Sequence, residues 1–432
     1  MNRCFFLFGI LLSAIGFFAW KHVFNRQHYQ DSCSNFRSPV RTLEGHPFTC
    51  GWQQLRPKTF GDFVPYAFIQ PNGSWCWSNA GFMASLHGPG LLVDTLMDPV
   101  LTSTMVAELK PATGTGGGEG RIGAVVFTHP DVDHILGNQA VSMEVPRLGD
   151  VKAQQDILAQ AKTLHRMRFT VNLGYLLWQA LQLIGGPRLL PSLPGWMRPR
   201  ALQVFSFANY AFKLGGFNLH TIDADKLPAF AKTIQTGDEI TLDIGDASPL
   251  PVKFWQMGSI HSKSDSVLLL PQSRVCYTGD LLFIGIAPVM WAGPAKSWVT
   301  ALDDLLKATG EDWLFVPGHG PVTDAIGVQH VKSYFEYLHQ AVSENCADLP
   351  LMQPELDETC AWRTLERMPN QLKEHFHEPE RIVICAVIER VALRTGAPAK
   401  VDVKFKLQWI SKMSEYELKR DYLSTRLMRS EL

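Results

Sequence analysis

Four potential metal ligands, His129, Asp131, Asp133 and His134, lie in a single short stretch of the chain. The residues just before them, 122–127, form a short apolar run that is typical of a buried strand. Imidazoles and carboxylates crowded onto one loop would repel one another without a cation, and both are ordinary ligands of zinc and iron. The stretch therefore predicts a metal site, with a solvated loop that happens to be rich in His and Asp as the alternative.

Three further candidate ligands follow along the chain, at His261, Asp280 and His319. Each follows an apolar run that is expected to be a strand, and each has small or turn-forming residues beside it. Gly279 and Gly318 are examples, because a glycine lets the backbone turn sharply and approach an ion closely. The three residues strengthen the prediction of a metal site and extend it over several strand ends.

At these residues the sequence resembles the metallo-β-lactamase-fold hydrolases, a superfamily that includes glyoxalase II enzymes, lactonases, alkylsulfatases and lactamases. The resemblance runs from about residue 79 to residue 322. It consists of five blocks in the family's order, at residues 79–82, 91–95, 128–134, 275–283 and 317–321. It implies an α/β fold of four layers, αββα, in which two sheets are covered by helices.

The resemblance also implies two zinc ions per chain, whose ligands can be assigned residue by residue. The first ion would be held by His129, Asp131 and His261. The second would be held by Asp133, His134 and His319, with Asp280 bridging both. The sequence departs from the family at Asp131, where most members have a histidine. An oxygen ligand there makes iron or manganese more plausible than in an all-histidine pocket.

The activity implied by the resemblance is metal-dependent hydrolysis of an ester, thioester, lactone or phosphodiester. A lipid-like substrate is a further expectation, which follows from the membrane anchor and the basic segment described below. Metal-bound water can titrate near pH 7, and Asp133 is the residue we assign to orienting the resulting hydroxide. No serine or cysteine nucleophile is needed, and no Gly-x-Ser-x-Gly motif occurs. Two alternatives remain: a di-iron or persulfide-type redox enzyme on the same fold, and a membrane-tethered protein with a vestigial site.

The glycine-rich residues 113–120 lack a following Lys-Ser/Thr, so no phosphate-binding site is predicted there.

The composition and charge limit the classes of function and partner that the chain can have. The chain has 432 residues, 46% of them hydrophobic, which is enough for a large core. The formal net charge of −1 gives no preference for nucleic acid as a partner. Residues 4–20 carry no charged side chain, so residues 1–25 are expected to be a signal-anchor or a cleaved signal peptide, with a buried helix as the third alternative.

Four regions are therefore expected: the anchor, a linker at 26–60, the metal-binding domain at 61–323 and a mostly helical appendage at 324–432. The expected location is a membrane or the secretory pathway, including the lumen of the endoplasmic reticulum, because residues 429–432 resemble a retrieval signal. Within the appendage, residues 401–409 have a β-type pattern. The spacings of Cys33 with Cys50 and of Cys346 with Cys360 are compatible with disulfides in an oxidising compartment and equally with free thiols in a reducing one.

One further segment stands out because residues 157–222 contain no acidic residue. Its basic residues are interleaved with aromatic ones and comprise Lys162, Arg166, Arg168, Arg188, Arg198, Arg200 and Lys213. The segment is expected to be a helical insertion. It is either a lid with solvent-facing arginines or a set of short amphipathic helices that lie in the headgroup region of a membrane.

Overall fold

The computed structural model describes residues 50–57, 63–70, 76–85, 88–113, 121–149, 154–215, 222–223, 225, 227, 232–233, 239–241, 251–399 and 401–422. The expected anchor at residues 4–20, Cys33 and the carboxyl-terminal residues 429–432 lie outside these residues. No helix in the described ranges is both long and apolar enough to cross a membrane.

The chain forms two compact units, which are described separately below. The larger unit comprises Asn35–Thr163 and Thr221–Asp402, and the smaller comprises Met1–Ser34, Leu164–His220 and Val403–Leu432. Helix α5, Gln154–Leu183, begins in the larger unit and continues into the smaller one.

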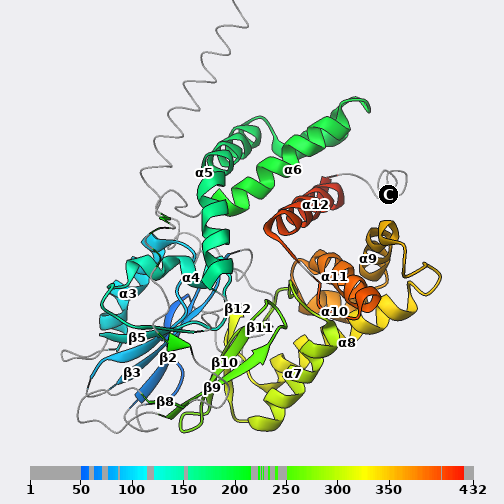
Figure 1. Ribbon diagram of the computed structural model, residues 1–432. Coiled ribbons are helices and arrows are strands. Elements are labelled where there is room, and N and C mark those ends of the chain that lie inside the picture. Colours follow the sequence, from blue (N-terminus) through cyan, green and yellow to red (C-terminus); the bar gives the residue numbers. More distant parts are fainter. Residues whose placement is uncertain are drawn as a thin grey trace, which may run out of the picture. The chain divides into compact units, whose positions relative to one another are not determined.

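Two mixed β-sheets form the centre of the larger unit (Figure 1). The first sheet has its strands in sequence order, antiparallel from β1 to β4 and parallel from β4 to β7. Its strands are β1 Gly51–Gln54, β2 Phe63–Ile69, β3 Ala80–Ser85, β4 Gly90–Val93, β5 Ile122–Val126, β6 Arg147–Gly149 and β7 Lys232–Thr233. The second sheet has the order β12-β11-β10-β9-β8, in which only β11 and β12 are parallel. Its strands are β8 Glu239–Thr241, β9 Pro251–Gly258, β10 Asp265–Leu270, β11 Val275–Phe283 and β12 Leu314–His319.

The hydrophobic core of this unit lies between the two sheets. It joins Phe63 and Leu91 of the first sheet to Phe254 and Leu268 of the second, among others. Tyr277 crosses the interface, because its hydroxyl donates to the Tyr66 carbonyl oxygen at 3.0 Å. Strands that are buried on both faces have nearly continuous apolar sequences, and the strands of this core follow that pattern.

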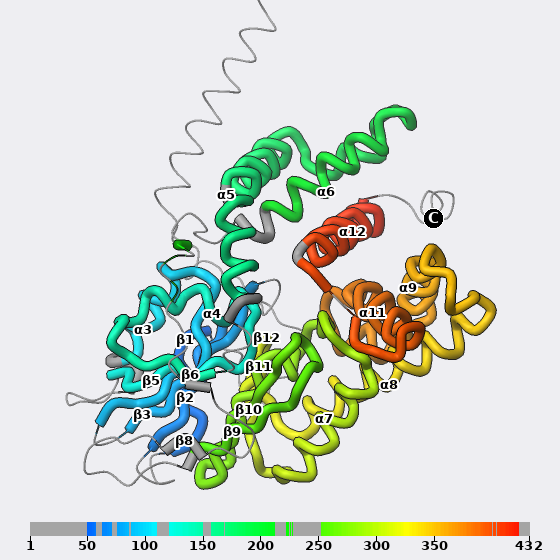
Figure 2. The backbone as a smooth tube through the Cα atoms, in the orientation of Figure 1, coloured from blue at the N-terminus to red at the C-terminus, as the bar shows by residue number. Residues whose placement is uncertain are grey.

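Helices cover the outer faces of both sheets and complete four layers. On the first sheet, the Trp52 indole N–H of β1 donates to Met105 of α3, Pro99–Thr113, at 2.9 Å. On the second, Trp298 of α7, Ala295–Ala308, donates to the Leu281 carbonyl oxygen of β11 at 3.0 Å. The predicted layered α/β architecture is therefore confirmed. Figure 2 shows the chain order, with the first sheet mainly in blue to cyan and the second in green to yellow.

The helices that follow β12 belong largely to the larger unit. They are α8 Ala325–Glu344, η8 Pro354–Leu356, α9 Asp357–Glu366, α10 Asn370–His375, η9 Pro379–Arg381 and α11 Ile382–Thr395. The buried carboxylate of Glu389 in α11 connects them to the second sheet's helix layer. It accepts from the Ala295 backbone N–H at the start of α7 at 2.6 Å and lies 2.8 Å from His339 Nδ1 of α8. This part of the expected appendage thus packs on the sheet domain itself.

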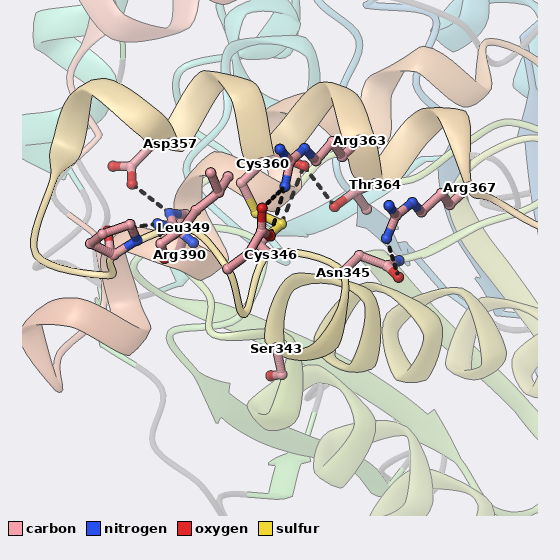
Figure 3. The surroundings of a disulfide bond; sticks show 12 residues. Ser343, Asn345, Cys346, Leu349, Asp357, Cys360, Arg363, Thr364, Arg367 and Arg390 are labelled. Atoms are coloured by element: carbon pink, nitrogen blue, oxygen red, sulfur yellow. Dashed lines mark hydrogen bonds and ion pairs between the residues drawn. A yellow bond between two sulfur atoms is a disulfide. The ribbon is translucent and has the colours of Figure 1, made fainter.

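A disulfide between Cys346 and Cys360 joins the loop after α8 to α9 (Figure 3). Both cysteines are buried, and next to the bridge Arg390 donates to the Asp357 carboxylate at 2.9 Å. Of the two alternatives for this pair, the disulfide is the one found. Three of the described cysteines, Cys76, Cys276 and Cys385, are not in a disulfide.

Removal of this disulfide should lower the stability of the larger unit. The cysteines are 14 residues apart, and a loop of that size corresponds to about 3 kcal/mol in the chain-entropy model. We expect the Cys346→Ser/Cys360→Ser variant to unfold at a lower urea concentration than the wild type, and dithiothreitol to lower the midpoint of the wild type more than that of the double variant. Cys76→Ser, which changes a cysteine outside any disulfide, is the matched control. Equal midpoints for the double variant and the control would contradict this prediction.

The smaller unit is helical in its described part. It contains the later part of α5, then η5 Gly186–Ser192, α6 Arg198–Gly215 and α12 Val403–Tyr422. The expectation of helices in residues 157–222 agrees with these elements. Gly185 and Gly186, both with positive φ, follow the end of α5 and precede Pro187.

Two sequence expectations differ from the structure. The prediction of β structure for residues 401–409 is wrong, because helix α12 begins at Val403. Trp409 and Met413, four residues apart, are both buried, so a helical face explains the apolar spacing. The expected linker at 26–60 also ends early, since β1 pairs with β2 from Gly51 onward.

Candidate metal centre

The seven predicted ligands all come together at one end of the sheets. His129, Asp131, Asp133 and His134 lie on the loop after β5 and on α4, Val132–Ile135. The other three occupy the turn between β9 and β10, strand β11 and the end of β12, and are His261, Asp280 and His319. All seven side chains are buried. The carboxyl ends of neighbouring parallel strands meet at one edge of a sheet, which is why residues far apart in sequence converge here.

Asp280 is at the centre of this cluster. Its carboxylate oxygens lie 3.0 Å from His134 Nε2 and 3.2 Å from His261 Nε2. The distances to His129 Nε2 and His319 Nε2 are 3.6 and 3.4 Å. Gly318 makes room for it, because a Cβ atom on Gly318 would lie 1.8 Å from Asp280 Oδ1.

The remaining ligands form two groups on either side of Asp280. His129, Asp131 and His261 have ligand atoms within 4.8 Å of one another, and so do Asp133, His134 and His319. Between them, Asp131 Oδ2 lies 3.0 Å from His261 Nε2, and Asp133 Oδ2 lies 3.4 Å from His319 Nε2. The grouping is the same as the one that the family resemblance implies for two metal ions. In the first group, the carboxylate of Asp131 lies where the family resemblance implies a histidine in most members.

The ring nitrogens that face Asp280 have lone pairs available for a metal. The Val289 carbonyl oxygen can only accept, so His261 Nδ1 donates to it at 2.7 Å, and Nε2 is the nitrogen that faces the carboxylates and would bind a metal after losing its proton. In the same way His134 Nδ1 donates to Asp94 Oδ2 at 3.0 Å. Tautomers fixed in this way by a second hydrogen bond are the usual state of metal-ligating histidines.

Several buried polar atoms of the cluster have no hydrogen-bond partner among the described residues. Three of them meet at Asp280, namely His129 Nε2, His134 Nε2 and Asp280 Oδ1 itself. The fourth is His319 Nδ1, whose ring faces Asp280 with its other nitrogen, Nε2. Although His134 Nε2 and Asp280 Oδ1 are only 3.0 Å apart, their geometry does not make a hydrogen bond. Buried polar atoms are normally paired, so unpaired atoms that converge on one point require an explanation. A bound cation between them provides it, and the donor set of imidazoles and carboxylates fits a transition metal.

The electrostatics of the cluster favour positive charge at its centre. Burial raises the pKa of Asp280, but the surrounding imidazoles, first His319 and His134, outweigh burial and hold that pKa well below its usual value. Burial lowers the pKa of His319, yet Asp280 and Asp133 outweigh it and raise the pKa to about 9. The pKa of His134 is raised well above its usual value by the same balance of burial against Asp280. Without a metal the site therefore retains protons, which a divalent cation would displace.

A buried network holds two of the histidines in place, with Asp94 at its centre. Asp94 Oδ2 accepts from His134 Nδ1 at 3.0 Å and from Thr128 Oγ1 at 2.7 Å, while Asp94 Oδ1 accepts from the Thr128 backbone N–H at 2.8 Å. Thr128 Oγ1 in turn lies 3.0 Å from His129 Nδ1. Asp94 binds the side of the His134 ring that faces away from Asp280, so it positions a ligand and does not replace one.

Two residues next to β3 hold the ligand loops by their backbones. Ser78 Oγ donates to the Asp133 carbonyl oxygen at 2.5 Å. Asn79 Nδ2 donates to the Pro317 and Gly320 carbonyl oxygens at 2.9 and 2.7 Å, on both sides of the final histidine ligand. Neither Ser78 nor Asn79 was among the predicted site residues, and Asn79 had appeared only as part of a family block. Their polar side chains beside a strand were the available signal.

The helices after β12 hold the wall behind His261. The segment between β11 and α7 carries the Val289 carbonyl oxygen that fixes the His261 ring. The preceding carbonyl oxygen, of Pro288, accepts from the Tyr334 hydroxyl of α8 at 3.4 Å and from the Cys385 thiol of α11 at 3.5 Å. Two helices of the expected appendage therefore help to position a predicted metal ligand.

Comparison with known proteins gives structural matches only. No protein-family model matches the chain, and no curated protein matches it. Among solved structures, a double mutant of the sec-alkyl sulfatase PisA1 is 16% identical with a TM-score of 0.49, over 79% of this chain. This chain spans only 50% of that sulfatase. TMB-1 is 12% identical with a TM-score of 0.39, over 66% of this chain and 97% of its own.

A third match is the metallo-β-lactamase DIM-1, at 14% identity and a TM-score of 0.38, over 67% of this chain and 99% of its own. An alkylsulfatase and a metallo-β-lactamase are both among the classes named by the sequence resemblance. The assignment of the layers and of the site nevertheless rests on the strand pairing and the side-chain contacts of this chain.

Proposed function

We propose that this protein is a metal-dependent hydrolase with two metal ions held by the seven clustered residues. The observation that supports the proposal most is the convergence of four buried imidazole nitrogens on the Asp280 carboxylate at 3.0–3.6 Å, two of which, His129 Nε2 and His134 Nε2, have no hydrogen-bond partner among the described residues. Zinc is the proposed metal. The carboxylate of Asp131, where most relatives by resemblance have a histidine, favours iron or manganese as the alternative.

In this proposal the metal ions and the residues that hold them have different roles. Bound metal ions lower the pKa of water towards 7 and polarise the substrate oxygen. Asp133 is the residue proposed to orient the attacking water, because its side chain is 13% exposed and the other six are 9% exposed or less. A substrate therefore reaches this carboxylate more easily than the other predicted ligands. His319 Nε2 lies 3.4 Å from Asp133 Oδ2, so both would bind the second metal, and the ring of Phe283 stacks on His319 with centroids 4.9 Å apart.

The proposed substrates are esters, thioesters, lactones and phosphodiesters, including lipid-like ones. A screen of these four bond types with the full-length protein tests the proposal. We expect turnover of at least one class, loss of turnover with a strong chelator, and recovery with added zinc. Turnover that survives complete metal removal would contradict it. Oxygen uptake by an iron-loaded protein that hydrolyses none of the four would favour the redox alternative.

Replacement of Asp131 by histidine is expected to change the metal preference. The variant exchanges a hard oxygen ligand for an imidazole in the group with His129 and His261, so zinc should gain relative to iron and manganese. Competition of the three metals for the apo-protein, followed by elemental analysis, measures the ratio. The same ratio in the wild type and Asp131→His would mean that Asp131 is not a ligand.

The proposed location is a membrane or the secretory pathway, including the endoplasmic reticulum lumen. The charge-free residues 4–20 and the Cys346–Cys360 disulfide support this proposal, since structural disulfides persist in oxidising compartments. No nucleic acid partner is expected. The vestigial-site alternative is weakened by the network of Asp94, Thr128 and Asn79, which still holds the ligands in place.

A further inference from the structure

Large apolar side chains remain exposed on one part of the smaller unit. Most of the exposed large hydrophobic residues among the described ranges lie on α5, on α6 or on the turn between these helices. They are Phe169, Leu173, Leu183, Ile184, Trp196, Met197, Val204 and Phe207. Trp196 is 78% exposed and Phe169 is 75% exposed. Large exposed apolar side chains that gather on neighbouring elements of a folded protein are typical of an interaction site.

Within each helix, the exposed residues share one face. On α5, Phe169 and Leu173 are four residues apart, and on α6 Val204 and Phe207 are three apart, which are the spacings of side chains on one side of a helix. Exposed arginines extend both rows at the same spacing. Arg166 precedes Phe169 by three residues, and Arg200 precedes Val204 by four.

The two helices meet where these rows run. A Cβ atom on Gly174 of α5 would lie 2.3 Å from the Ala211 Cβ and 3.0 Å from a ring carbon of Phe207, both on α6. Phe207 is therefore next to the backbone of α5 at the residue that follows Leu173. The exposed residues of α5 and α6 thus form a common surface over two helices.

The opposite side of α6 is already covered by α12. Leu202 and Phe205 pack with Leu418 in a small core. Asn209 Nδ2 donates to Ser414 Oγ at 2.8 Å, and Ser414 Oγ donates to the Ser206 carbonyl oxygen at 3.1 Å. The unit therefore has a packed inner face, and the exposed apolar face is not needed for its own core.

The charge on this surface has a single sign. Arg166, Arg188 and Arg200 are exposed, and within the described part of the chain none of them has an ion-pair partner. Arg198 differs, because it donates to the Leu193 and Pro191 carbonyl oxygens and so belongs to the turn.

The acidic residues that the structure describes in this unit lie on α12 and have partners. Glu415 pairs with Lys419 at 3.2 Å, Asp421 pairs with Arg420 at 2.8 Å, and Glu417 accepts from Asn209 at 3.3 Å. Residues 157–222 contribute no acidic residue. Among the described residues of this unit, every carboxylate therefore has a partner other than the exposed arginines of α5 and α6.

We infer that this surface, which we call the arginine–aromatic face, docks on an anionic lipid bilayer. We define it as Arg166, Phe169, Leu173, Arg188, Trp196, Arg200, Val204 and Phe207. Helices with an apolar side, exposed tryptophan and flanking arginines lie in the plane of the interface and bury the apolar side among the headgroups. Arginines at its border meet a surface of uniformly negative charge, whereas a protein partner normally presents both signs.

The interruptions between the helices agree with a face that lies on a bilayer and not with a helix that crosses it. Gly185 and Gly186 end α5, and Pro187 and Pro191 lie in the short helix η5 that follows. The face is thus assembled from short pieces, and none of the described helices could cross a bilayer. This inference concerns a binding partner and is independent of the hydrolytic function proposed above.

Fluorescence of Trp196 in the full-length protein tests the inference. Vesicles of phosphatidylcholine, with or without an equal amount of phosphatidylserine, carry brominated acyl chains that quench tryptophan. The difference in quenching between wild type and Trp196→Phe isolates this side chain, because residues 4–20 and all other tryptophans are present in both. We expect a clear difference with phosphatidylserine at about 0.01 M salt, and its loss at about 1 M salt, where the Debye length falls from about 30 to about 3 Å.

Charge variants then distinguish docking on anionic lipid from a non-specific apolar contact. The triple variant Arg166→Glu/Arg188→Glu/Arg200→Glu should abolish the difference, whereas the matched Arg→Lys triple variant should keep it. Absence of any difference between wild type and Trp196→Phe in all vesicles would overturn the inference, whatever the folding of the triple variants. So would an equal difference in neutral vesicles. A dimer in solution that is lost in Phe169→Asp/Phe207→Asp would assign the face to a second copy of the chain instead.

Discussion

Replacement of Asp280 by asparagine is expected to remove metal from both halves of the site and to lower hydrolysis by several orders of magnitude. Asp280 is the one carboxylate within 3.6 Å of all four histidines, so its charge is shared by both predicted ligand groups. An amide of the same size keeps the packing but loses the negative charge that binds cations. Elemental analysis after dialysis, together with turnover of the best substrate, measures both effects.

The matched control for this variant is Asp98→Asn. Asp98 is also buried, but it caps α3 by accepting from the Val100 backbone N–H at 2.8 Å, and asparagine caps helices as well as aspartate. Asp98→Asn should keep its metal and activity. An Asp280→Asn protein that retains two metal ions per chain would show that Asp280 does not bridge the site.

The second large effect is expected at Asp94, which is not one of the seven predicted ligands. Asp94→Asn should weaken metal binding by about 10- to 100-fold, which is the usual loss when the carboxylate behind a ligating histidine is removed. The asparagine can still accept from Thr128 but no longer carries the charge that holds the His134 Nδ1 proton. Competition with a chelator of known affinity measures the loss.

Asparagine is the suitable replacement because of the backbone at this position. Asp94 has a φ of 57°, in the left-handed region that Asn tolerates and that Ala adopts with strain. Asp94→Ala would therefore combine two effects, whereas Asp94→Asn isolates the hydrogen bond. Unchanged metal affinity in Asp94→Asn, with normal affinity in Asp98→Asn, would mean that the carboxylate has no positioning role.

The candidate ligands could be predicted from the sequence because metal ligands have few chemical types and follow strands. His129, Asp131, Asp133 and His134 were close together in sequence, and the three distant residues each followed an apolar run. The contribution of Asp94 could not be recognised in the same way. A lone aspartate after a strand is compatible with many roles, and only the 3.0 Å distance to His134 Nδ1 identifies this one.

The layers of the fold were predicted from the resemblance, but the division of the chain was not. Helix α12 belongs with α6, through contacts such as Asn209 with Ser414, while α8 and α11 belong with the metal centre. Contacts between residues about two hundred positions apart leave no local pattern. Strand β1, Gly51–Gln54, has only one large apolar residue, so its pairing with β2 decides its structure.

The metal content of the purified full-length protein tests the central claim most directly. Elemental analysis should find close to two transition-metal ions per chain, mainly zinc, with iron or manganese as the alternative. The unpaired ring nitrogens around Asp280 are the structural reason for this expectation. Less than about half an equivalent of any transition metal, even after reconstitution with zinc, iron and manganese, would contradict the assignment of the site as a two-metal centre.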